Sequence, residues 1–294
     1  MIHKSLECVI RMESLLAESP VWCTKQQALY WIDMLRGLIH CFYPQSGTFN
    51  SIEIKQFISS VGLCIDGHLL VSLSDTICKF NLISNKMNII YRKEKDDGEN
   101  RFNDGRCDRK GRFWSTTKNL LAPEKNTASI YRLDVDHSTH LIQERVVTGN
   151  GMGWDPKNNL FYFTETLLRT IFVYDFDLEH GSLSNRRVFV KLDDTIQGLP
   201  DGLVVDSEGC VWTAIYGGGC VIRFNPIGQI EQRIELPVPL VTSCTFGGVN
   251  LDILYITTAQ EWMNNERISQ FPLSGSLFSI KPGVRGIPEP YYRG

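Results

Sequence analysis

Apolar residues gather into short runs that recur along the chain at a nearly constant interval. The runs begin at Leu29, Leu69, Phe113, Leu160, Val211 and Leu254, so successive starts are 40, 44, 47, 51 and 43 residues apart. Several runs are followed by a segment of alternating apolar and polar residues that ends in Pro, Gly, Asn or Asp, as at 129–134, 171–175 and 221–225. Period-two alternation closed by turn residues indicates β-strands. A repeat of this length is typical of propeller blades built from four short strands.

The repeat predicts an all-β fold, a six-bladed β-propeller that spans residues 1–294 as a single domain. No amphipathic segment longer than about two helical turns interrupts the pattern. The apolar segment 7–12 precedes the first motif, and we expect it to complete the last blade and close the ring, which removes exposed sheet edges. An open β-sandwich with coincidental spacing is the alternative, but six periods in register disfavour it.

A polar side chain begins a similar motif in four of these repeats. The copies start at Asn103, Asn150, Asp201 and, in a looser form, Glu18. The first strand of each propeller blade lines the central channel, so equivalent residues converge on the axis. Glu18 fits the ring by its spacing to the apolar run at Leu29. Alignment on the aspartates that close the motif, Asp66, Asp108, Asp155 and Asp206, places four residues in one ring: Val61, Asn103, Asn150 and Asp201.

Two carboxylates and two amide oxygens around one axis form an all-oxygen donor set. Such a set suits Ca²⁺, Mg²⁺ or Mn²⁺, whereas Zn²⁺ usually takes nitrogen and sulfur ligands. Asn-Gly and Asp-Gly pairs also form turns, and a single copy would favour that interpretation. Four copies in register favour a site instead. We assign the aspartates that close the motif to blade turns rather than to chemistry.

Charge and cysteine usage narrow the class of protein. The formal net charge of -3 gives no electrostatic reason to expect nucleic acid or an anionic membrane as a partner. The nine cysteines are scattered, which is typical of reduced, buried thiols in a cytosolic protein. The first seven residues contain no apolar stretch like that of a signal peptide. We therefore expect a soluble, cytoplasmic protein, and no motif indicates protein partners.

The ordered motifs resemble the gluconolactonase/regucalcin (senescence-marker protein, luciferin-regenerating enzyme) family over essentially the whole chain. The segments that carry the resemblance are 18–22, 29–33, 101–105, 111–114, 150–151, 200–202, 241–244, 246–248, 254–259 and 283–286. The resemblance implies a six-bladed propeller with one divalent metal ion and, in many members, hydrolysis of sugar lactones.

Specific roles follow from the same resemblance. It implies that Glu18, Asn150 and Asp201 bind the metal, that Arg101 and Asn103 hold the substrate, and that Asp201 is also the candidate general base. The metal ion, Ca²⁺, Mg²⁺, Mn²⁺ or Zn²⁺, would polarise the carbonyl of an aldonolactone and lower the pKa of a bound water. Lys118 departs from the family pattern, because 115–118 reads Ser-Thr-Thr-Lys where relatives more often have Ala-Gly-Thr-Met. The segment 120–127 is also individual to this chain.

Two other functions stay open at this point. A non-catalytic propeller could use the same residues to bind calcium in a regulatory role. An esterase or phosphotriesterase could apply the same metal site to another substrate. A serine hydrolase is disfavoured because the chain contains no Gly-x-Ser-x-Gly motif.

Overall fold

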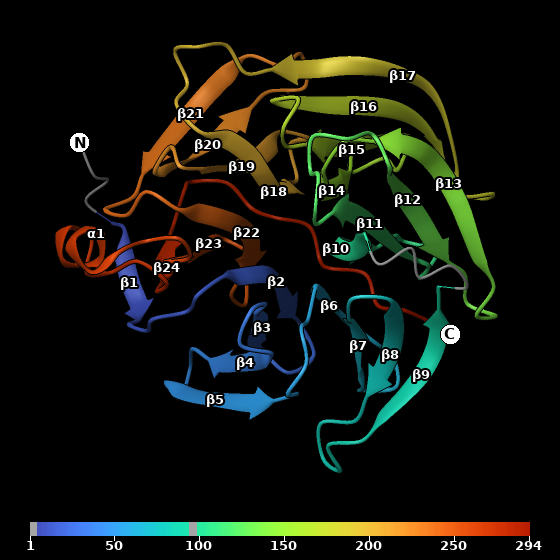
Figure 1. The fold of residues 1–294 in the computed structure, drawn as a ribbon, viewed down its shortest axis with the longest axis horizontal. Coiled ribbons are helices and arrows are strands. Elements are labelled where there is room, and N and C mark those ends of the chain that lie inside the picture. The colour runs from blue at the N-terminus through green and yellow to red at the C-terminus, as the bar shows by residue number, and fades with distance from the viewer. Residues whose placement is uncertain (1–4, 94–98) are drawn as a thin grey trace.

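Six antiparallel four-stranded sheets surround a central axis in the computed structural model, which describes residues 5–93 and 99–294 (Figure 1). Residues 1–4, which belong to the segment considered for a signal peptide, lie outside the described residues. The first three sheets contain β2 (Ala17–Cys23), β3 (Ala28–Asp33), β4 (Leu38–Tyr43) and β5 (Thr48–Glu53); β6 (Ser60–Leu63), β7 (Leu69–Ser72), β8 (Thr76–Phe80) and β9 (Met87–Arg92); and β10 (Asn100–Cys107), β11 (Phe113–Asn119), β12 (Ala128–Leu133) and β13 (Thr139–Val146).

The next two sheets contain β14 (Gly149–Trp154), β15 (Leu160–Glu165), β16 (Thr170–Asp177) and β17 (Ser182–Lys191); and β18 (Leu199–Val205), β19 (Val211–Tyr216), β20 (Cys220–Phe224) and β21 (Ile230–Glu235). The last sheet contains β22 (Val241–Gly247), β23 (Ile253–Thr258), β24 (Leu277–Ile280) and β1 (Glu7–Ile10). One short helix, α1 (Asn265–Gln270), lies between β23 and β24. The predicted six-bladed β-propeller is confirmed.

The sixth blade joins the two ends of the described chain. β1 pairs antiparallel with β24, with Glu7 opposite Ser279 and Cys8 opposite Phe278. The strand order in this sheet is β1-β24-β23-β22. The prediction that the early strand completes the last blade is therefore confirmed, and its pairing covers the free edge of β24.

Burial divides each blade into inner and outer strands. The three inner strands of the first five blades are mostly buried, whereas the outermost strands β5, β9, β13, β17 and β21 are largely exposed. Aromatic side chains fill the space between neighbouring sheets. Trp212 meets Phe246 of the next blade edge to face at 5.9 Å, and Trp22 stacks on Tyr255 at 5.8 Å. The nine cysteines are free thiols, and all but Cys8 are buried.

A buried aspartate closes the turn after the innermost strand in three blades, namely Asp108, Asp155 and Asp206. Asp206 accepts hydrogen bonds from the backbone of Glu208 and Cys210, from Trp212 Nε1 at 2.9 Å and from Arg223 Nε at 2.8 Å. Asp108 uses its carboxylate in the same way, on a backbone turn, a tryptophan and an arginine. These aspartates stabilise blade turns, as the sequence predicts.

Five of the six innermost strands contain a β-bulge at the level of the polar motif. The register of β10 shifts between Phe102 and Gly105, and β2, β14, β18 and β22 shift at the corresponding places. Bulges redirect side chains and occur next to functional sites. In β14 and β18 the bulge contains Asn150-Gly151 and Asp201-Gly202, so these pairs lie inside strands and form no turn. A Cβ at Gly202 would overlap Ser243 of the next blade, which explains the glycine.

The predicted alignment of the second blade is wrong. β6 pairs with β7 without a register shift, so it lacks the bulge. The turn residue that corresponds to Asp108 is Cys64, because the backbone NH of Cys64 bonds to His68 as that of Asp108 bonds to Arg112. Asp66, which the predicted alignment used as the turn residue of this blade, therefore lies two residues after the true turn residue. Val61 does not belong to the ring of Asn103, Asn150 and Asp201.

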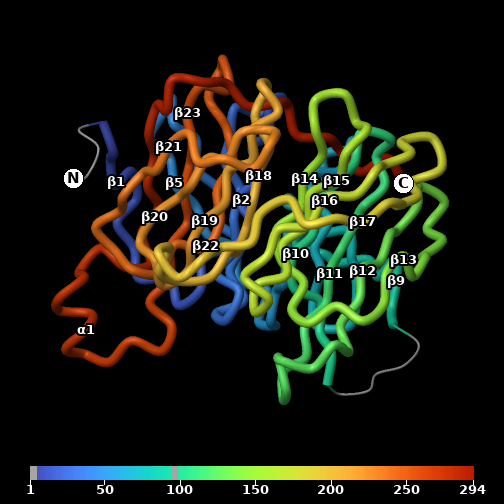
Figure 2. The backbone as a smooth tube through the Cα atoms, turned by 90° about the horizontal axis from the view of Figure 1, so that it is seen from above, coloured from blue at the N-terminus to red at the C-terminus, as the bar shows by residue number. Residues whose placement is uncertain are grey.

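The last residues of the chain cross one end of the ring. The segment after β24, dark red in Figure 1, runs over the middle of the propeller. It is held by backbone hydrogen bonds from Tyr292 to Leu63, from Gly286 to Leu251 and from Arg293 to Gly111. Figure 2 shows this segment and α1 on opposite faces of the molecule. The central channel is therefore covered on one face and approached from the face of α1.

The buried turn aspartate provides a stability test. Replacement of Asp206 by Ala leaves Trp212 Nε1 and Arg223 without their buried acceptor, and we expect unfolding to become easier by about 3 kcal/mol or more. Asp66→Ala is the control, because Asp66 is exposed and its ion pair with Lys79 should contribute less than about 1 kcal/mol. Urea denaturation of both variants measures the difference. Equal losses would contradict the assignment.

Candidate functional site

A cavity of about 260 Å³ lies at the open end of the channel. The four polar residues that begin the repeated motif face this cavity, each from the innermost strand of a different blade. They are Glu18, Asn103, Asn150 and Asp201. Its apolar wall comes mainly from loops and contains Leu16, Met34, Pro123, Leu167, Leu199 and Trp262. Ligand pockets usually have volumes of about 300–1,000 Å³, so this cavity lies just below that range and suits a ligand at the small end of it.

Glu18 and Asp201 form the acidic centre of the cavity. Both are buried, at 7% and 6% exposure. Burial raises the pKa of the Glu18 carboxyl well above its usual range, and the neighbouring charge of Asp201 raises it further. Burial likewise raises the pKa of Asp201. Two buried carboxylates in one place are unfavourable unless a cation balances them.

The remaining polar atoms around these carboxylates fit a cation. Asp201 Oδ1 is buried and has no hydrogen-bond partner within residues 5–93 and 99–294. Asn150 lowers the pKa of Asp201 through a side-chain hydrogen bond, and its Nδ2 also donates to Thr166 Oγ1 at 3.2 Å. Donation through Nδ2 leaves Asn150 Oδ1 as the oxygen available to a metal. A buried, unpartnered carboxylate oxygen beside a second carboxylate is the donor chemistry that hard divalent cations require.

The bulge positions differ slightly among these residues. Asn103, Asn150 and Asp201 are each the first residue of their bulge, whereas in β2 that place belongs to Ser19. Ser19 has a positive φ of 51°, and its Oγ and the backbone of Val61 are hydrogen-bonded. Glu18 therefore faces the cavity from the position just before its bulge, one residue earlier in the strand than Asn103, Asn150 and Asp201 in theirs.

Arg101 and Asn103 lie beside the acidic centre on β10. Arg101 Nη1 donates to Asn103 Oδ1 at 3.2 Å and to the Phe102 carbonyl at 3.0 Å, and the guanidinium lies 4.1 Å from the Phe57 ring centre. Asn103 Nδ2 donates to the Gly149 carbonyl at 2.8 Å. Burial lowers the pKa of Arg101 to about 10. Asn103 faces the cavity directly, whereas Arg101 lies behind it and fixes the Asn103 amide.

Three further residues of the cavity come from loops or strand ends that carry no repeat signal. Tyr216 Oη donates to Glu261 Oε1 at 2.9 Å, and Trp262, which is 91% exposed, lines the same rim. No pattern in the sequence predicted that Tyr216, Glu261 and Trp262 would line the cavity. They follow the ends of β19 and β23, where no motif recurs from blade to blade. Only the polar and aromatic character of 260–262, directly after an apolar strand, could have indicated them.

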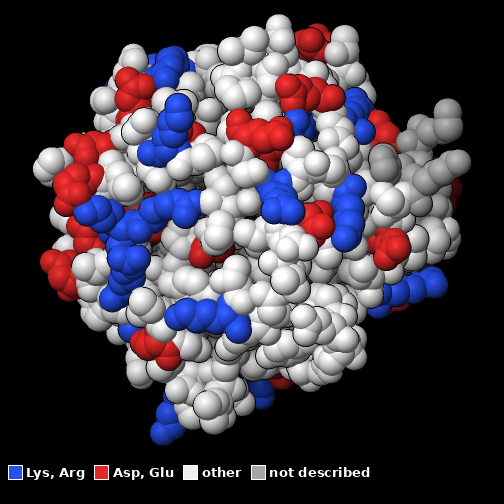
Figure 3. Space-filling model, turned by 180° about the vertical axis from the view of Figure 1, so that it is seen from behind, with Lys and Arg blue, Asp and Glu red and all other residues white. Residues whose placement is uncertain are grey.

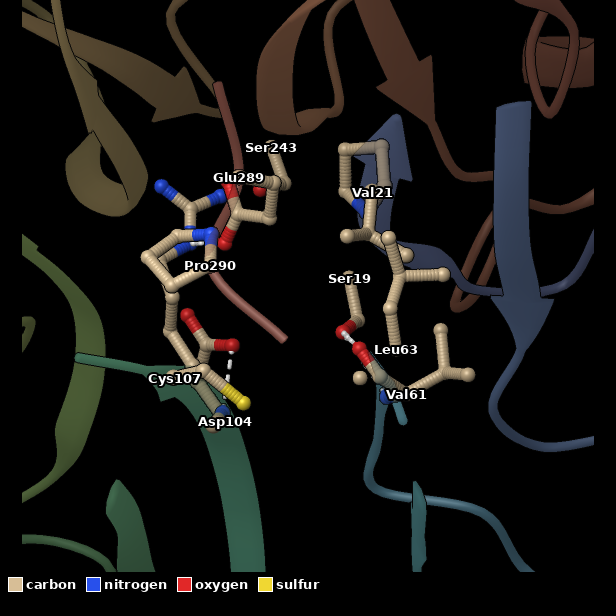
Figure 4. A pocket seen from close by; sticks show the side chains of 13 residues that line it. Ser19, Val21, Val61, Leu63, Asp104, Cys107, Ser243, Glu289 and Pro290 are labelled. Atoms are coloured by element: carbon tan, nitrogen blue, oxygen red, sulfur yellow. Dashed lines mark hydrogen bonds and ion pairs between the residues drawn. The ribbon is translucent and has the colours of Figure 1, made fainter. Parts of the chain in front are cut away.

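A second cavity lies near the covered end of the channel (Figure 4). In Figure 4, Asp104 and Glu289 stand on one wall, and Ser19, Val61 and Leu63 stand on the other. Arg106 pairs with Glu289 at 3.3 Å and donates to the Leu203 carbonyl at 3.1 Å. The space of about 10 Å³ is that of a single water, so it is too small for a substrate.

An acidic group elsewhere does not compete as a metal site. Among the residues that the structure describes, Asp206, Glu208 and Cys210 place ligand atoms within 4.8 Å of one another. The Asp206 carboxylate is already used by the blade turn, as described above, and Arg223 also pairs with Glu208.

Figure 3 shows acidic and basic side chains interspersed over the face seen from behind. Across residues 5–93 and 99–294, no helix has the length and apolar character needed to cross a membrane.

Comparison with known proteins assigns the family. The family model described as "SMP-30/Gluconolactonase/LRE-like region" matches residues 16–260, which include all the polar residues discussed for the larger cavity except Glu261. The chain belongs to this family. The resemblance that the sequence motifs indicate is confirmed.

Relatives within the SMP-30/gluconolactonase/LRE-like family have names of two kinds. The chain is 33% identical to 6-deoxy-6-sulfogluconolactonase of Pseudomonas putida, with 100% of both chains covered. It is 34% identical to regucalcin of Gallus gallus, with 97% of each chain covered. Among solved structures, a calcium-binding protein, regucalcin, of Agrobacterium tumefaciens is 25% identical and superimposes with a TM-score of 0.93, over 98% of this chain and 97% of that one.

The electrostatic cost of the acidic centre can be measured without activity. The folded-state pKa of Asp201 is raised, so this group favours folding at low pH and loses that contribution as the pH rises through the folded value. In the presence of a chelator, which removes bound metal ions, the Asp201→Asn variant should therefore melt at a higher temperature than the wild type, by about 2 °C or more at pH 8. The gain should shrink toward pH 5, because a raised pKa favours protonation of the wild-type carboxyl as the pH falls. Thermal melts at both pH values test this, and a variant less stable at pH 8 would contradict it.

Proposed function

We propose that this chain is a metal-dependent hydrolase that opens a sugar lactone, with Glu18, Asn150 and Asp201 as the metal ligands. The observation that carries the proposal is the pair of buried carboxylates in the cavity of about 260 Å³ at the open end of the channel, where Asp201 Oδ1 has no hydrogen-bond partner among the described residues. The lactonase name of the relative from Pseudomonas putida supports the substrate class. A bound divalent cation would polarise the lactone carbonyl and lower the pKa of a nearby water.

The chain's own residues then have distinct tasks. Asp201 accepts the proton of the attacking water as general base. The water oxygen adds to the lactone carbonyl carbon, the bond from that carbon to the ring oxygen breaks, and the ring oxygen takes the proton that Asp201 holds. The resulting aldonic acid releases its carboxyl proton to solvent and becomes the open aldonate. Asn103 orients the substrate through its amide. Arg101 fixes Asn103 and adds positive charge where oxyanion charge develops.

Cavity shape restricts the approach of substrate and water. The C-terminal segment covers one end of the channel, so a lactone enters from the face of α1. The apolar wall with Leu16, Met34 and Leu199 limits bulk water around the reacting atoms. The exposed ring of Trp262 offers an apolar face to the sugar at the rim.

A calcium-binding regulatory propeller is the second candidate. It is favoured by the regucalcin names of the relative from Gallus gallus and of the structure from Agrobacterium tumefaciens. The same three ligands would hold the ion, without turnover. The two functions differ in one measurable property, which is the opening of a lactone ring.

The hydrolase proposal is tested with a panel of aldonolactones. Ring opening is measured in the presence of a chelator and again after addition of Ca²⁺, Mg²⁺, Mn²⁺ or Zn²⁺. We expect turnover with at least one metal ion and its loss in chelator, because the acidic centre needs a cation. Asp201→Ala should lower kcat by at least about 100-fold, the range typical of a lost general base, with circular dichroism unchanged. Metal binding without ring opening by the wild type would favour the regulatory propeller.

Asn103→Ala separates substrate orientation from metal binding. The variant loses the amide that faces the cavity but keeps Glu18, Asn150 and Asp201, so metal-induced thermal stabilisation should persist while kcat/KM falls. Steady-state kinetics and melts with and without Mn²⁺ measure the two effects. Loss of the metal-induced shift in this variant would show that Asn103 belongs to the metal site.

A further inference from the structure

Lys118 faces the cavity from β11, across from the substrate-orienting residues. Its backbone pairs with Arg101 of β10 and also bridges to Thr148. The side chain is half-buried and lines the cavity together with Glu18 and Asp201. A lysine therefore stands in the wall of a site whose other polar atoms are mostly acceptors.

The Lys118 ammonium makes no hydrogen bond and no ion pair within 4.0 Å to any residue that the structure describes. Other lysines differ in this respect. Lys79 pairs with Asp66 at 2.9 Å, and the half-buried head of Lys93 donates to the Asn100 carbonyl at 2.7 Å. The carboxylates Asp201, Glu261 and Glu18 act on Lys118 only through longer-range electrostatics. A half-buried cation without a direct partner is costly, and this cost is tolerated where a ligand supplies the partner.

Neighbouring groups are already committed to other contacts. Glu261 accepts the Tyr216 hydroxyl, and Arg101 uses Nη1 on Asn103 and packs on Phe57. All three ammonium donors of Lys118 are therefore available to the cavity. An ammonium group donates most strongly to an anionic acceptor. The charged residues that line the cavity are the three carboxylates of Glu18, Asp201 and Glu261 and the ammonium of Lys118, so a bound divalent cation would balance the charge of the lining. With that balance, no net negative charge of the lining repels an anionic substituent.

We propose that Lys118 binds an anionic substituent of the substrate, so that the preferred lactone carries a carboxylate, sulfonate or phosphate group away from its carbonyl. The inference rests on the proposed lactonase function, and it assigns to Lys118 a specificity role and no part in bond breaking. A charge-assisted hydrogen bond in a partly buried site contributes strongly to such selectivity.

The kinetic test compares D-glucono-1,5-lactone with its 6-phosphate, after subtraction of spontaneous hydrolysis. We expect the wild type to have at least about ten-fold higher kcat/KM for the phosphate, the size expected for one charged hydrogen bond. Lys118→Met keeps the length of the side chain and should reduce that preference by about ten-fold or more. Lys125→Met is the matched control, because Lys125 is exposed in the adjacent loop and should leave the preference intact.

A binding test does not depend on turnover. Titration calorimetry in the presence of saturating Mn²⁺ compares gluconate, glucarate and 6-phosphogluconate, of which the last two carry an extra terminal anion. Lys118→Met should weaken glucarate and 6-phosphogluconate relative to gluconate. The two anions together distinguish a carboxylate preference from a phosphate preference.

The outcomes separate the inference from the function on which it rests. Equal losses on neutral and phosphorylated lactones in Lys118→Met would overturn the specificity role, because Lys118 would then act at the reacting centre. Unchanged selectivity in an active variant would overturn it as well. If neither lactone is opened but Lys118→Met still selectively weakens the doubly charged ligands, the anion site stands and the lactonase proposal fails.

Discussion

The central constraint on the site is the electrostatic repulsion between two buried carboxylates, Glu18 and Asp201, at the propeller axis. Neither has a basic side chain in direct contact, and Asp201 Oδ1 has no partner. Isolated buried charges of one sign destabilise a folded protein. The first and fifth blades, with the sixth between them, hold the two carboxylates in place, because β2 and β18 are themselves buried innermost strands. The divalent cation proposed above would offset this electrostatic cost.

The β-bulges explain how the same scaffold makes both a tight core and a polar cavity. The bulges of β10, β14 and β18 each add a residue to an innermost strand and turn a polar side chain toward the open end, while the flanking residues remain in the sheet. The bulge glycine lets the neighbouring blade approach closely. At the opposite end, Arg106, Glu289 and the C-terminal segment fill the channel. The reaction space is thus restricted to one face.

The fold was predictable because its information is local and repeated. Apolar runs at regular intervals predict the blades, and the segment 7–12 had only one sheet edge to join. The alignment of the second blade failed because Cys64 occupies the place of the turn aspartate and β6 lacks the bulge, neither of which composition reveals. A one-residue change in a strand moves a side chain to the other face.

The candidate site was predictable only in part for a related reason. Glu18, Asn103, Asn150 and Asp201 belong to the repeat, and the structure brings them to one cavity. Tyr216, Glu261 and Trp262 come from loops unique to their blades, so no periodicity could place them. The sequence shows that Lys118 departs from the family pattern. Only the three-dimensional structure shows that its ammonium group has no hydrogen bond or ion pair with any described residue.

Anomalous diffraction from crystals grown with Mn²⁺ tests the central claim most directly. The account predicts one dominant peak between Glu18, Asn150 and Asp201, with oxygen distances of about 2.0–2.6 Å, the range for hard divalent cations. The absence of a peak there, or a dominant peak at Asp206 and Glu208, would contradict it.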